Sequence, residues 1–493
     1  MLTIILSSSQ KVMQAWVSPT LSPSMLPAAV ILLAFVIWPI YRLAFSPTRK
    51  LPGPWYTKLA SFFMQYHAFK GTKRLWIHNL HLKYGNVVRL APHEASFASA
   101  AAVAEIYTSG GGYAKTDLYS LFKQEGHTNL FTALDKKDHN EKKRRFADLY
   151  SNTSILGSCV LDSIRDRAET FTSACSEIAS ADIYLYLHCY ALDCVTAALF
   201  HPYGTQSIEG GSDKEMVRCL SYHDSRRAMV LQHYHPWILY FYNMFFRDVS
   251  KGGPLIHNYA WTSMRKGNHS DFTLAARLLE YPKIGLSNMV AECLDHIGAG
   301  IDTTGDTLCF LMWELSQPYN MKRMERLSKE LRTTKADGRL ENLPYLSAVI
   351  QEALRLWAPG TLPLPRYVPN GGRVIDGYFL QAKVIVSCQS YTLHRFDSTA
   401  FEDPDTFLPE RWLEDEGSTE RQRLFFAFGS GARTCIGKYL ALAEMRALLY
   451  SVYSQFRTRP ADDMHASMKL SDQFITSRPE GMCCKLAFER LDS

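Results

Sequence analysis

Near the C-terminus the chain reads Phe428-Gly429-Ser430-Gly431-Ala432-Arg433-Thr434-Cys435-Ile436-Gly437. The residues that follow, 440–448, carry apolar side chains at helical spacing. Cys435 is therefore expected at the N-terminus of a helix, where the helix dipole and Arg433 both favour an ionised sulfur. The glycines allow backbone N–H groups to approach the sulfur, and Phe428 would shield it from water. This loop predicts a thiolate that binds a metal such as iron.

A single cysteine in a glycine-rich turn also has a plainer interpretation, because free cysteines are commonly buried structural residues. Three further motifs upstream favour the metal-binding interpretation. The ten-residue run resembles the haem-binding loop of the cytochrome P-450 superfamily, with its Phe428, a glycine four residues before Cys435, an arginine two before it and a glycine two after it. The resemblance covers nearly all of the chain after residue 50.

The resemblance implies a mainly α-helical fold with small β-sheets around one haem b. It makes Cys435 the axial ligand of the haem iron, with Arg433, Phe428 and Gly429 among the residues that hold the cofactor. The helix at residues 438–445 and the pair His394-Arg395 look most like filamentous-fungal members of the family that tailor secondary metabolites.

The motif Ala299-Gly300-Ile301-Asp302-Thr303-Thr304 lies inside an apolar segment from about Ser287 to Leu315, which is expected to form one helix. A threonine hydroxyl can bond back to the carbonyl group four residues earlier, here that of Ala299. Taken alone, the motif also fits a helix N-cap or a polar helix face. It resembles the family's helix over the haem, so Thr303 is expected to orient oxygen and Asp302 to relay protons.

Glu352 and Arg355 share a helix face at three-residue spacing. Such pairs are usually exposed and contribute well under about 1 kcal/mol. Apolar neighbours such as Trp357 indicate burial here, and a buried pair needs a third partner. Arg411 resembles the family's third partner. We therefore expect these two arginines and Glu352 to form a structural clamp behind the haem loop.

Leu364-Pro365-Arg366 resembles the strand that passes along the haem edge in this family. Arg366 and Arg433 are expected to bind the haem propionates, because guanidinium groups suit carboxylates. The family's further propionate contact comes from an aromatic residue and, four positions later, an arginine. His139 and Lys143 occupy these positions here, which departs from the family pattern. The basic run around them also fits a solvated helix face.

The same resemblance assigns a substrate pocket to segments that are mostly apolar. Such a lining fits a hydrophobic small molecule, although each aliphatic side chain would equally suit an ordinary core. The residues expected to line this pocket are Leu130, Phe131, His296, Leu362, Leu364 and Phe474.

The segment from Met25 to Tyr41 carries no charge, and Arg42, Arg49 and Lys50 follow it. Its length is at the lower end of the roughly 17 to 25 residues that span a bilayer. Positive charge on its C-terminal side places the bulk of the protein in the cytosol. A cleaved signal peptide is the alternative interpretation.

A proline-rich run, Leu51-Pro52-Gly53-Pro54, resembles the hinge of microsomal members of the family. The expected organisation is a lumenal segment at 1–24, a transmembrane anchor at 25–46, a hinge at 47–60 and a single catalytic domain at 61–493. The protein is thus expected in the endoplasmic reticulum membrane, in contact with membrane lipid.

Composition narrows the class of protein. The 11 cysteines lack the spacing of zinc or disulfide frameworks, which favours a reducing compartment. A net charge of +6 over 493 residues is mild and gives no sign of nucleic-acid binding. No dinucleotide-binding fingerprint follows a strand, so electrons are expected from a partner. The basic residues near the loop that could meet an acidic flavoprotein are Arg421, Arg423, Arg433 and Lys438.

The resemblance implies a monooxygenase that inserts one oxygen atom into a hydrophobic small molecule, such as a fungal polyketide, terpenoid or alkaloid. Electrons would come from NADPH through a cytochrome P-450 reductase, with cytochrome b5 as a second donor. Multi-step oxidation or oxidative coupling would use the same residues. A haem-thiolate isomerase or dehydratase would need no reductase and could dispense with Asp302 and Thr303. A non-catalytic haem sensor would keep the thiolate loop without turnover.

Overall fold

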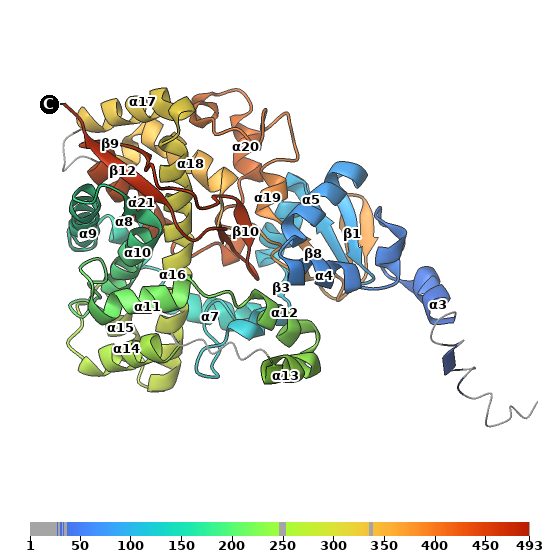
Figure 1. Cartoon of the computed structure of the whole chain (residues 1–493). Coiled ribbons are helices and arrows are strands. Elements are labelled where there is room, and N and C mark those ends of the chain that lie inside the picture. The colour runs from blue at the N-terminus through green and yellow to red at the C-terminus, as the bar shows by residue number, and fades with distance from the viewer. Residues whose placement is uncertain are drawn as a thin grey trace, which may run out of the picture.

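The computed structural model describes residues 37–245, 253–334 and 339–492, together with Pro27, Val30, Ile31 and Leu33. Helices make up most of the fold and the strands gather in small sheets, which confirms the expected fold class (Figure 1). The α-helices among the described residues up to 245 are α3 (Trp38–Phe45), α4 (Phe62–Lys70), α5 (Lys73–Tyr84), α6 (Ala100–Val103), α7 (Lys136–Phe146), α8 (Asn152–Ile155), α9 (Ser158–Ser176), α10 (Ile183–Phe200), α11 (Gly211–Ser221), α12 (Arg226–Tyr234) and α13 (Pro236–Phe245). The later helices are α14 (Gly253–Lys266), α15 (Leu274–Leu279), α16 (Leu286–Leu315), α17 (Met321–Arg332), α18 (Pro344–Leu356), α19 (Ser390–Leu393), α20 (Ser418–Leu424) and α21 (Lys438–Tyr453).

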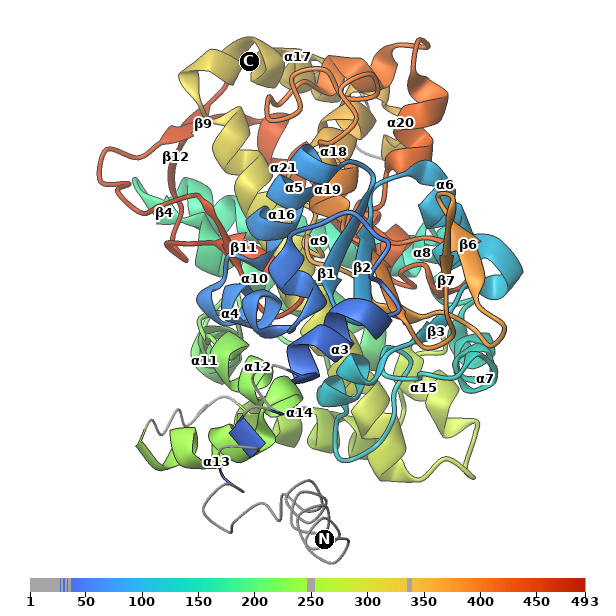
Figure 2. The same ribbon diagram turned by 90° about the vertical axis from the view of Figure 1, so that its right-hand side faces the viewer.

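The largest sheet has five strands in the order β1-β2-β8-β5-β3. β1 and β2 pair antiparallel with Val87 opposite Phe97, whereas β2 and β8 run parallel with Glu94 opposite Ile385. The sheet therefore joins segments from both halves of the chain (Figure 2). Its strands are β1 (Val87–Ala91), β2 (Glu94–Phe97), β3 (Ala114–Lys115), β5 (Arg366–Tyr367) and β8 (Ile385–Cys388).

Shorter sheets complete the fold. One has the order β4-β12-β9, and two are hairpins, β6-β7 and β10-β11. β12 joins the end of the chain to β4, which precedes α10. The bounds are β4 (Ala181–Asp182), β6 (Arg373–Ile375), β7 (Tyr378–Leu380), β9 (Phe456–Pro460), β10 (Leu470–Asp472), β11 (Ser477–Pro479) and β12 (Lys485–Arg490).

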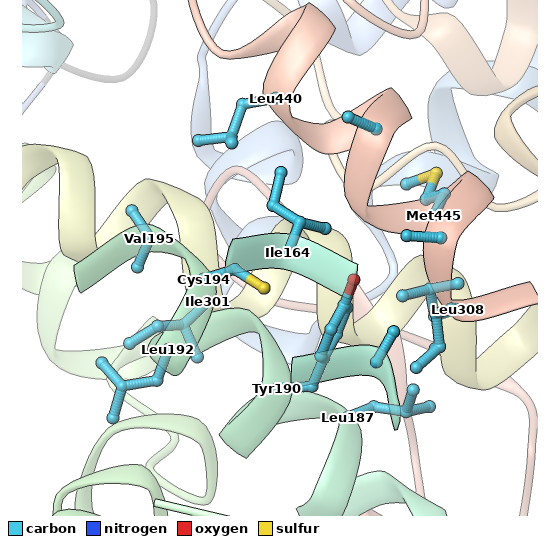
Figure 3. Close-up of a cluster of buried hydrophobic side chains, with 14 of the residues drawn as sticks. Ile164, Leu187, Tyr190, Leu192, Cys194, Val195, Ile301, Leu308, Leu440 and Met445 are labelled. Carbon is cyan, nitrogen blue, oxygen red and sulfur yellow. The ribbon is translucent and has the colours of Figure 1, made fainter. Parts of the chain in front are cut away.

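The helical core forms around α16, the long apolar helix expected from about 287 to 315. Its buried side chains meet those of α9, α10 and α21, and Figure 3 shows Ile301 and Leu308 of α16 among them. Each fully buried aliphatic side chain stabilises the fold by roughly 1.5–3 kcal/mol relative to exposure. The Tyr190 hydroxyl on α10 donates to the Glu444 carbonyl oxygen of α21 at 2.9 Å. The helix that follows the thiolate loop is thereby held against the core.

The expected hinge is fixed to the sheet by one buried residue, Arg89 of β1. Its Nη2 donates to the carbonyl oxygens of Gly53 and Pro54 at 3.0 and 2.9 Å, and its amide N donates to that of Pro52 at 2.8 Å. Gly53 has a φ of +143°, and a Cβ there would lie 3.0 Å from the Arg89 carbonyl oxygen. The proline-rich run is thus a rigid edge of the fold.

The expected lumenal segment at 1–24 lies outside the described residues, and so do residues 25, 26, 28, 29, 32 and 34–36 of the expected anchor at 25–46. α3 is described, and it projects from the end of the molecule that holds the five-stranded sheet (Figure 1). Among the described residues, only α10 is long and apolar enough to cross a membrane, and it is 83% buried in the core.

Candidate functional site

Cys435 lies in the loop that precedes α21, and its amide N donates to the Phe428 carbonyl oxygen at 2.9 Å. Gly429 and Gly431 have φ values of +69° and +72°, a backbone region that side chains disfavour. A Cβ on Gly431 would overlap the carbonyl oxygen of Tyr107. The loop conformation therefore depends on the glycines that the sequence singled out.

The Cys435 side chain is exposed by accessible surface, yet protein surrounds it closely enough for burial to raise the pKa of its thiol. The backbone N–H of Gly437 and the ammonium groups of Lys143 and Lys438 act in the opposite direction. α21 begins at Lys438, three residues after the cysteine. Backbone and cationic groups therefore favour the thiolate, and a bound metal cation would complete the ionisation.

Arg366 and Arg433 lie close enough to repel each other. Arg366 Nη1 donates to the Tyr119 hydroxyl at 2.6 Å, while Arg433 donates to the carbonyl oxygens of Ala133 and Leu134, both at 2.7 Å. Burial lowers the pKa of Arg433 to about 10, and the charge of Arg366 adds to this effect. The two guanidinium groups are held in place by uncharged partners.

Lys115 of β3 joins these arginines because β3 pairs with β5, with Lys115 opposite Arg366. Its Nζ lies 4.7 Å from the ring centres of both Tyr119 and Phe131. Burial, then Arg366 and Arg433, lower the pKa of Lys115 well below its ordinary value. Within the described part of the chain, none of these three cations forms an ion pair within 4 Å. Such a cluster fits a ligand with more than one carboxylate, as a haem has.

His139 and Lys143 lie on α7, which borders the same loop. His139 is buried, and burial together with Arg433 and Lys115 lowers its pKa to about 3, so the imidazole is neutral. Lys143 Nζ donates to the Ala432 carbonyl oxygen at 2.9 Å. Lys143 therefore contacts the thiolate loop directly.

Thr303 and Asp302 are neighbours on α16, but their side chains point in different directions. The Thr303 hydroxyl donates to the Ala299 carbonyl oxygen at 2.6 Å, the back-bond expected from the sequence. Asp302 Oδ1 accepts a hydrogen bond of 2.7 Å from Ser221 Oγ and lies 3.8 Å from Nε2 of His188. The alcohol and the acid are thus neighbours along the helix, with the acid turned toward α10 and α11.

Glu352, Arg355 and Arg411 meet in the interior. Arg355 forms a two-bonded fork with Glu352, at 2.9 and 2.8 Å, and Arg411 Nε donates to Glu352 Oε1 at 3.2 Å. The amide of Leu408 and the indole of Trp412 also donate to this carboxylate, at 2.9 and 2.8 Å. Glu352 and Arg355 have no exposed surface, so the pair is a buried one with its hydrogen bonds satisfied.

His394 connects this clamp to the thiolate loop. Its Nδ1 donates to the Arg355 carbonyl oxygen at 2.9 Å, and its Nε2 accepts from the Phe426 amide at 2.8 Å. Burial lowers the pKa of His394 to about 3, which keeps Nε2 free as an acceptor. The start of the loop is therefore held by a neutral imidazole.

The expected pocket residues divide into two groups. Phe131 packs against Phe122, and Phe122 packs against Phe474, with ring centres 5.5 and 6.0 Å apart. Leu364 approaches the thiolate loop, since a Cβ on Gly429 would lie 3.9 Å from its Cδ1. These apolar side chains come from three distant segments of the chain.

The second group is directed into the core. His296 Nδ1 lies 2.6 Å from the Tyr150 hydroxyl, and its ring is buried. Leu130 is buried, and its amide donates to Glu292 Oε1 at 2.9 Å. Leu362 is buried as well. All three side chains are therefore enclosed by protein.

Several residues of the site carried no signal in the sequence. Lys115, His188 and Asp295 belong to no motif, and the pair His394-Arg395 gave no sign of the contacts that His394 makes; the partners of all four come from other elements. Asp295 of α16 accepts a hydrogen bond from the Phe131 backbone, and burial and then Glu292 raise its pKa to about 7. Only the tertiary fold brings these groups to the haem-binding motifs.

The model for the family described as cytochrome P-450 matches residues 52–484. The chain belongs to the cytochrome P-450 family. Similar proteins include cytochrome P-450 monooxygenase orf2 of Aspergillus niger, which is 29% identical over 92% of this chain and 96% of its own length. Cytochrome P-450 monooxygenase stcB of Emericella nidulans is 29% identical over 90% of this chain and 89% of its own. Pisatin demethylase of Fusarium vanettenii is 28% identical over 85% of this chain and 87% of its own.

Two of these fungal relatives are named cytochrome P-450 monooxygenases, and this chain is an enzyme of that class. The family's cofactor is a haem bound by a cysteine thiolate. The family acts on small molecules and receives electrons from a redox partner. Cys435 and the cation cluster of Arg366, Arg433 and Lys115 fit such a cofactor.

Proposed function

We propose that this cytochrome P-450 hydroxylates or otherwise oxidises a hydrophobic secondary-metabolite intermediate, using dioxygen and electrons from NADPH through a reductase. The observation that carries the proposal is the combination of one thiol, Cys435, with three cations that form no ion pair within 4 Å among the described residues. A haem-thiolate isomerase or a haem sensor would share this combination. The acid–alcohol pair, Asp302 and Thr303, favours the monooxygenase.

The residues that would hold the haem follow from the site. Cys435 would bind the iron, and Arg366, Arg433 and Lys115 would face the propionates. When bound, the haem supplies the activation of dioxygen. Phe428 and Gly429 shape the thiolate loop, while His139 and Lys143 contribute a neutral ring and a cation beside it.

Proton handling falls to the chain's own side chains. Thr303 holds its hydroxyl on the Ala299 carbonyl oxygen, so its own oxygen stays free to accept a proton donor's hydrogen. Asp302 is the neighbouring acid, and it must release Ser221 before its carboxyl group can turn toward Thr303. The pair would deliver protons at Thr303 Oγ1.

The substrate would be recognised by apolar contact. Phe122, Phe131 and Phe474 form an aromatic wall, and Leu364 lies beside the thiolate loop. A polyketide, terpenoid or alkaloid scaffold suits such a lining. Two relatives, named pisatin demethylase and benzoate 4-monooxygenase, support a small-molecule substrate for this chain.

The electron donor would dock on the face that carries α20 and the start of α21. Arg423 is exposed there, and Lys438 is half-buried. The structure corrects two of the residues expected for this role. Arg421 is buried and donates to the Glu414 carbonyl oxygen, and Arg433 bonds inward to Ala133.

Membrane attachment is proposed from an exposed apolar surface as well as from the segment at 25–46. His235 Nε2 lies 2.9 Å from Gln65 Oε1, which joins the start of α13 to α4. We call the exposed large apolar side chains on these two helices and the preceding turn the apolar face; they are Trp55, Phe62, Phe63, Tyr66, Trp237, Tyr240, Phe241, Met244 and Phe245. Such a face beside an anchor helix fits an endoplasmic reticulum enzyme with its catalytic domain in the cytosol.

The proposal is tested by incubating the haem-loaded, full-length protein with a cytochrome P-450 reductase, NADPH and a panel of fungal polyketides, terpenoids and alkaloids under ¹⁸O₂. One labelled oxygen atom in a product, absent in Cys435→Ser, is expected. Turnover without NADPH would instead support an isomerase or dehydratase. A coupled or multiply oxidised product would identify the related oxidative alternatives.

A further inference from the structure

A buried group of charges lies behind Asp302, on the side of α16 that faces α10. His188 of α10 is fully buried, and its Nε2 lies 3.4 Å from Asp306 Oδ1 and 3.8 Å from Asp302 Oδ1. Asp302 and Asp306 are one helical turn apart, so they share a face of α16. One imidazole therefore faces two carboxylates.

Packing fixes the orientation of this imidazole. Nδ1 of His188 donates to the Tyr184 carbonyl oxygen at 2.7 Å, so that nitrogen carries a hydrogen in every protonation state. The ring lies against Gly305, where a Cβ would come within 3.0 Å of it. Nε2 is thus the atom that gains or loses a proton, and it points at the carboxylates.

His188 and Asp306 can share one proton between them. Within the part of the chain that the structure describes, neither His188 Nε2 nor Asp306 Oδ1 has a hydrogen-bond partner of good geometry. A buried polar atom left without a partner costs roughly 1–3 kcal/mol, and a proton shared by the two atoms would satisfy both. The titratable or charged groups that face the pair are Tyr184, Asp302, Cys309 and Arg478.

The pKa values of Asp306 and His188 are both shifted in the direction that retains a proton on the pair. Burial raises the pKa of Asp306 to about 6, although the charge of His188 acts against this. Burial acts to lower the pKa of His188, but the carboxylates of Asp306 and Asp302 outweigh it and raise the pKa. Around neutral pH the pair therefore retains a proton that an isolated aspartate and histidine would largely have lost.

We propose that His188 and Asp306 keep a proton in reserve beside Asp302 and replace the one that Asp302 passes to Thr303. The inference rests on the proposed function, because it requires Asp302 to relay protons. In the transfer, the Nε2–H bond of His188 breaks and an O–H bond forms on Asp302. His188 becomes neutral and keeps its bond to Tyr184. A proton from solvent reaches the half-exposed Asp302 and restores the pair between turnovers.

The test compares His188→Gln and Asp306→Asn with the wild type. His81→Gln is the matched control, because His81 is also fully buried and bonds Ser96 at 2.8 Å from a helix, α5, near the large sheet. The haem-loaded full-length protein is mixed with reductase, and NADPH oxidation is followed from about pH 5.5 to about pH 8.5 in H₂O and D₂O. NADPH oxidation that reduces dioxygen to hydrogen peroxide or to water consumes protons, so no substrate need be known.

The wild-type rate is expected to change little with pH. In both variants it should fall up to about tenfold for each pH unit above about pH 6, since Asp302 then depends on free protons. The solvent isotope effect should rise several-fold in both. Infrared difference spectra supply a readout independent of turnover. A protonated-carboxyl band that titrates near pH 6 should vanish in Asp306→Asn and shift in His188→Gln.

The proton reserve is wrong if His188→Gln and Asp306→Asn behave as His81→Gln does. It is also wrong if they lose rate equally at every pH and their solvent isotope effect is unchanged. Asp302→Asn separates this failure from that of the proposed function. If Asp302→Asn slows NADPH oxidation while the other two variants do not, only the reserve is wrong. If Asp302→Asn has no effect, the proposed relay role of Asp302 is wrong, and so is the proton reserve that depends on it.

Discussion

Glu444 shows how strongly burial acts on single residues of this protein. It lies on α21 with 2% of its surface exposed, and burial raises its pKa from the ordinary 4.5 to about 8, against the effect of a hydrogen bond with Thr304. The folded protein therefore holds this proton at neutral pH, where the unfolded chain has released it. The resulting stability is complete below about pH 4.5 and is lost as pH rises through about 8.

Glu444→Gln should remove this pH dependence while keeping the contact with Thr304. Relative to the wild type, the variant is expected to gain about 1.4 kcal/mol in free energy of unfolding for each pH unit between these limits. Urea unfolding at several pH values measures the difference. Glu489→Gln, a surface substitution on β12, serves as the control. If the difference in free energy of unfolding between the wild type and Glu444→Gln did not change with pH, Glu444 would be ionised in the folded protein.

Single residues could be predicted from the sequence only where a local motif contains them. Cys435, Thr303 and Glu352 stand in short runs whose spacing alone indicates their chemistry. Lys115 and His394 could not be predicted, because a lysine or histidine gains its role from groups far along the chain. Lys115 meets Arg366 only through the pairing of β3 and β5.

Among the elements, the thiolate loop depends most on backbone conformation. Gly431→Ala would place a methyl group on the Tyr107 carbonyl oxygen, at a φ of +72°. Gly267→Ala has a similar φ of +65° with open space around the added methyl group. Both changes carry the cost of a positive φ, but only the first displaces the loop.

The ratio of haem absorbance to protein absorbance after gel filtration should therefore fall several-fold in Gly431→Ala and stay near the wild-type ratio in Gly267→Ala. Equal haem retention in the two variants would mean that the loop tolerates the displacement.

The clamp between α18 and the Pro409–Leu413 turn makes a second prediction at this scale. Glu352→Gln would leave Arg355 and Arg411 buried without a carboxylate, which typically costs about 3–5 kcal/mol. The midpoint of urea unfolding should fall accordingly. Glu489→Gln again serves for comparison, since its arginine partners are exposed. A midpoint unchanged in Glu352→Gln would contradict a structural role for the clamp.

Elements were predictable in proportion to their length and periodicity. The central helix, expected from about 287 to 315, is α16 at Leu286–Leu315. β3 and β5, with two residues each, have no periodicity to detect, since tertiary pairing alone creates them.

For the whole molecule, the apolar face predicts how the protein lies on a bilayer. Trp55 and Trp237 are 70% and 65% exposed on it. With the full-length protein in vesicles that contain brominated lipid, tryptophan fluorescence should be quenched. Quenching should weaken in Trp55→Phe and in Trp237→Phe, and it should persist in Trp261→Phe, because Trp261 packs against the core from α14. Equal quenching in all three variants would place the membrane elsewhere.

The most direct test of the account is the carbon monoxide difference spectrum of the dithionite-reduced, full-length protein, with Cys435→Ala as control. Because a thiolate pushes electron density onto the haem iron, we expect a strongly red-shifted Soret band in the wild type and its loss in Cys435→Ala. A folded, haem-loaded wild type without that band would contradict thiolate ligation by Cys435 and, with it, the monooxygenase.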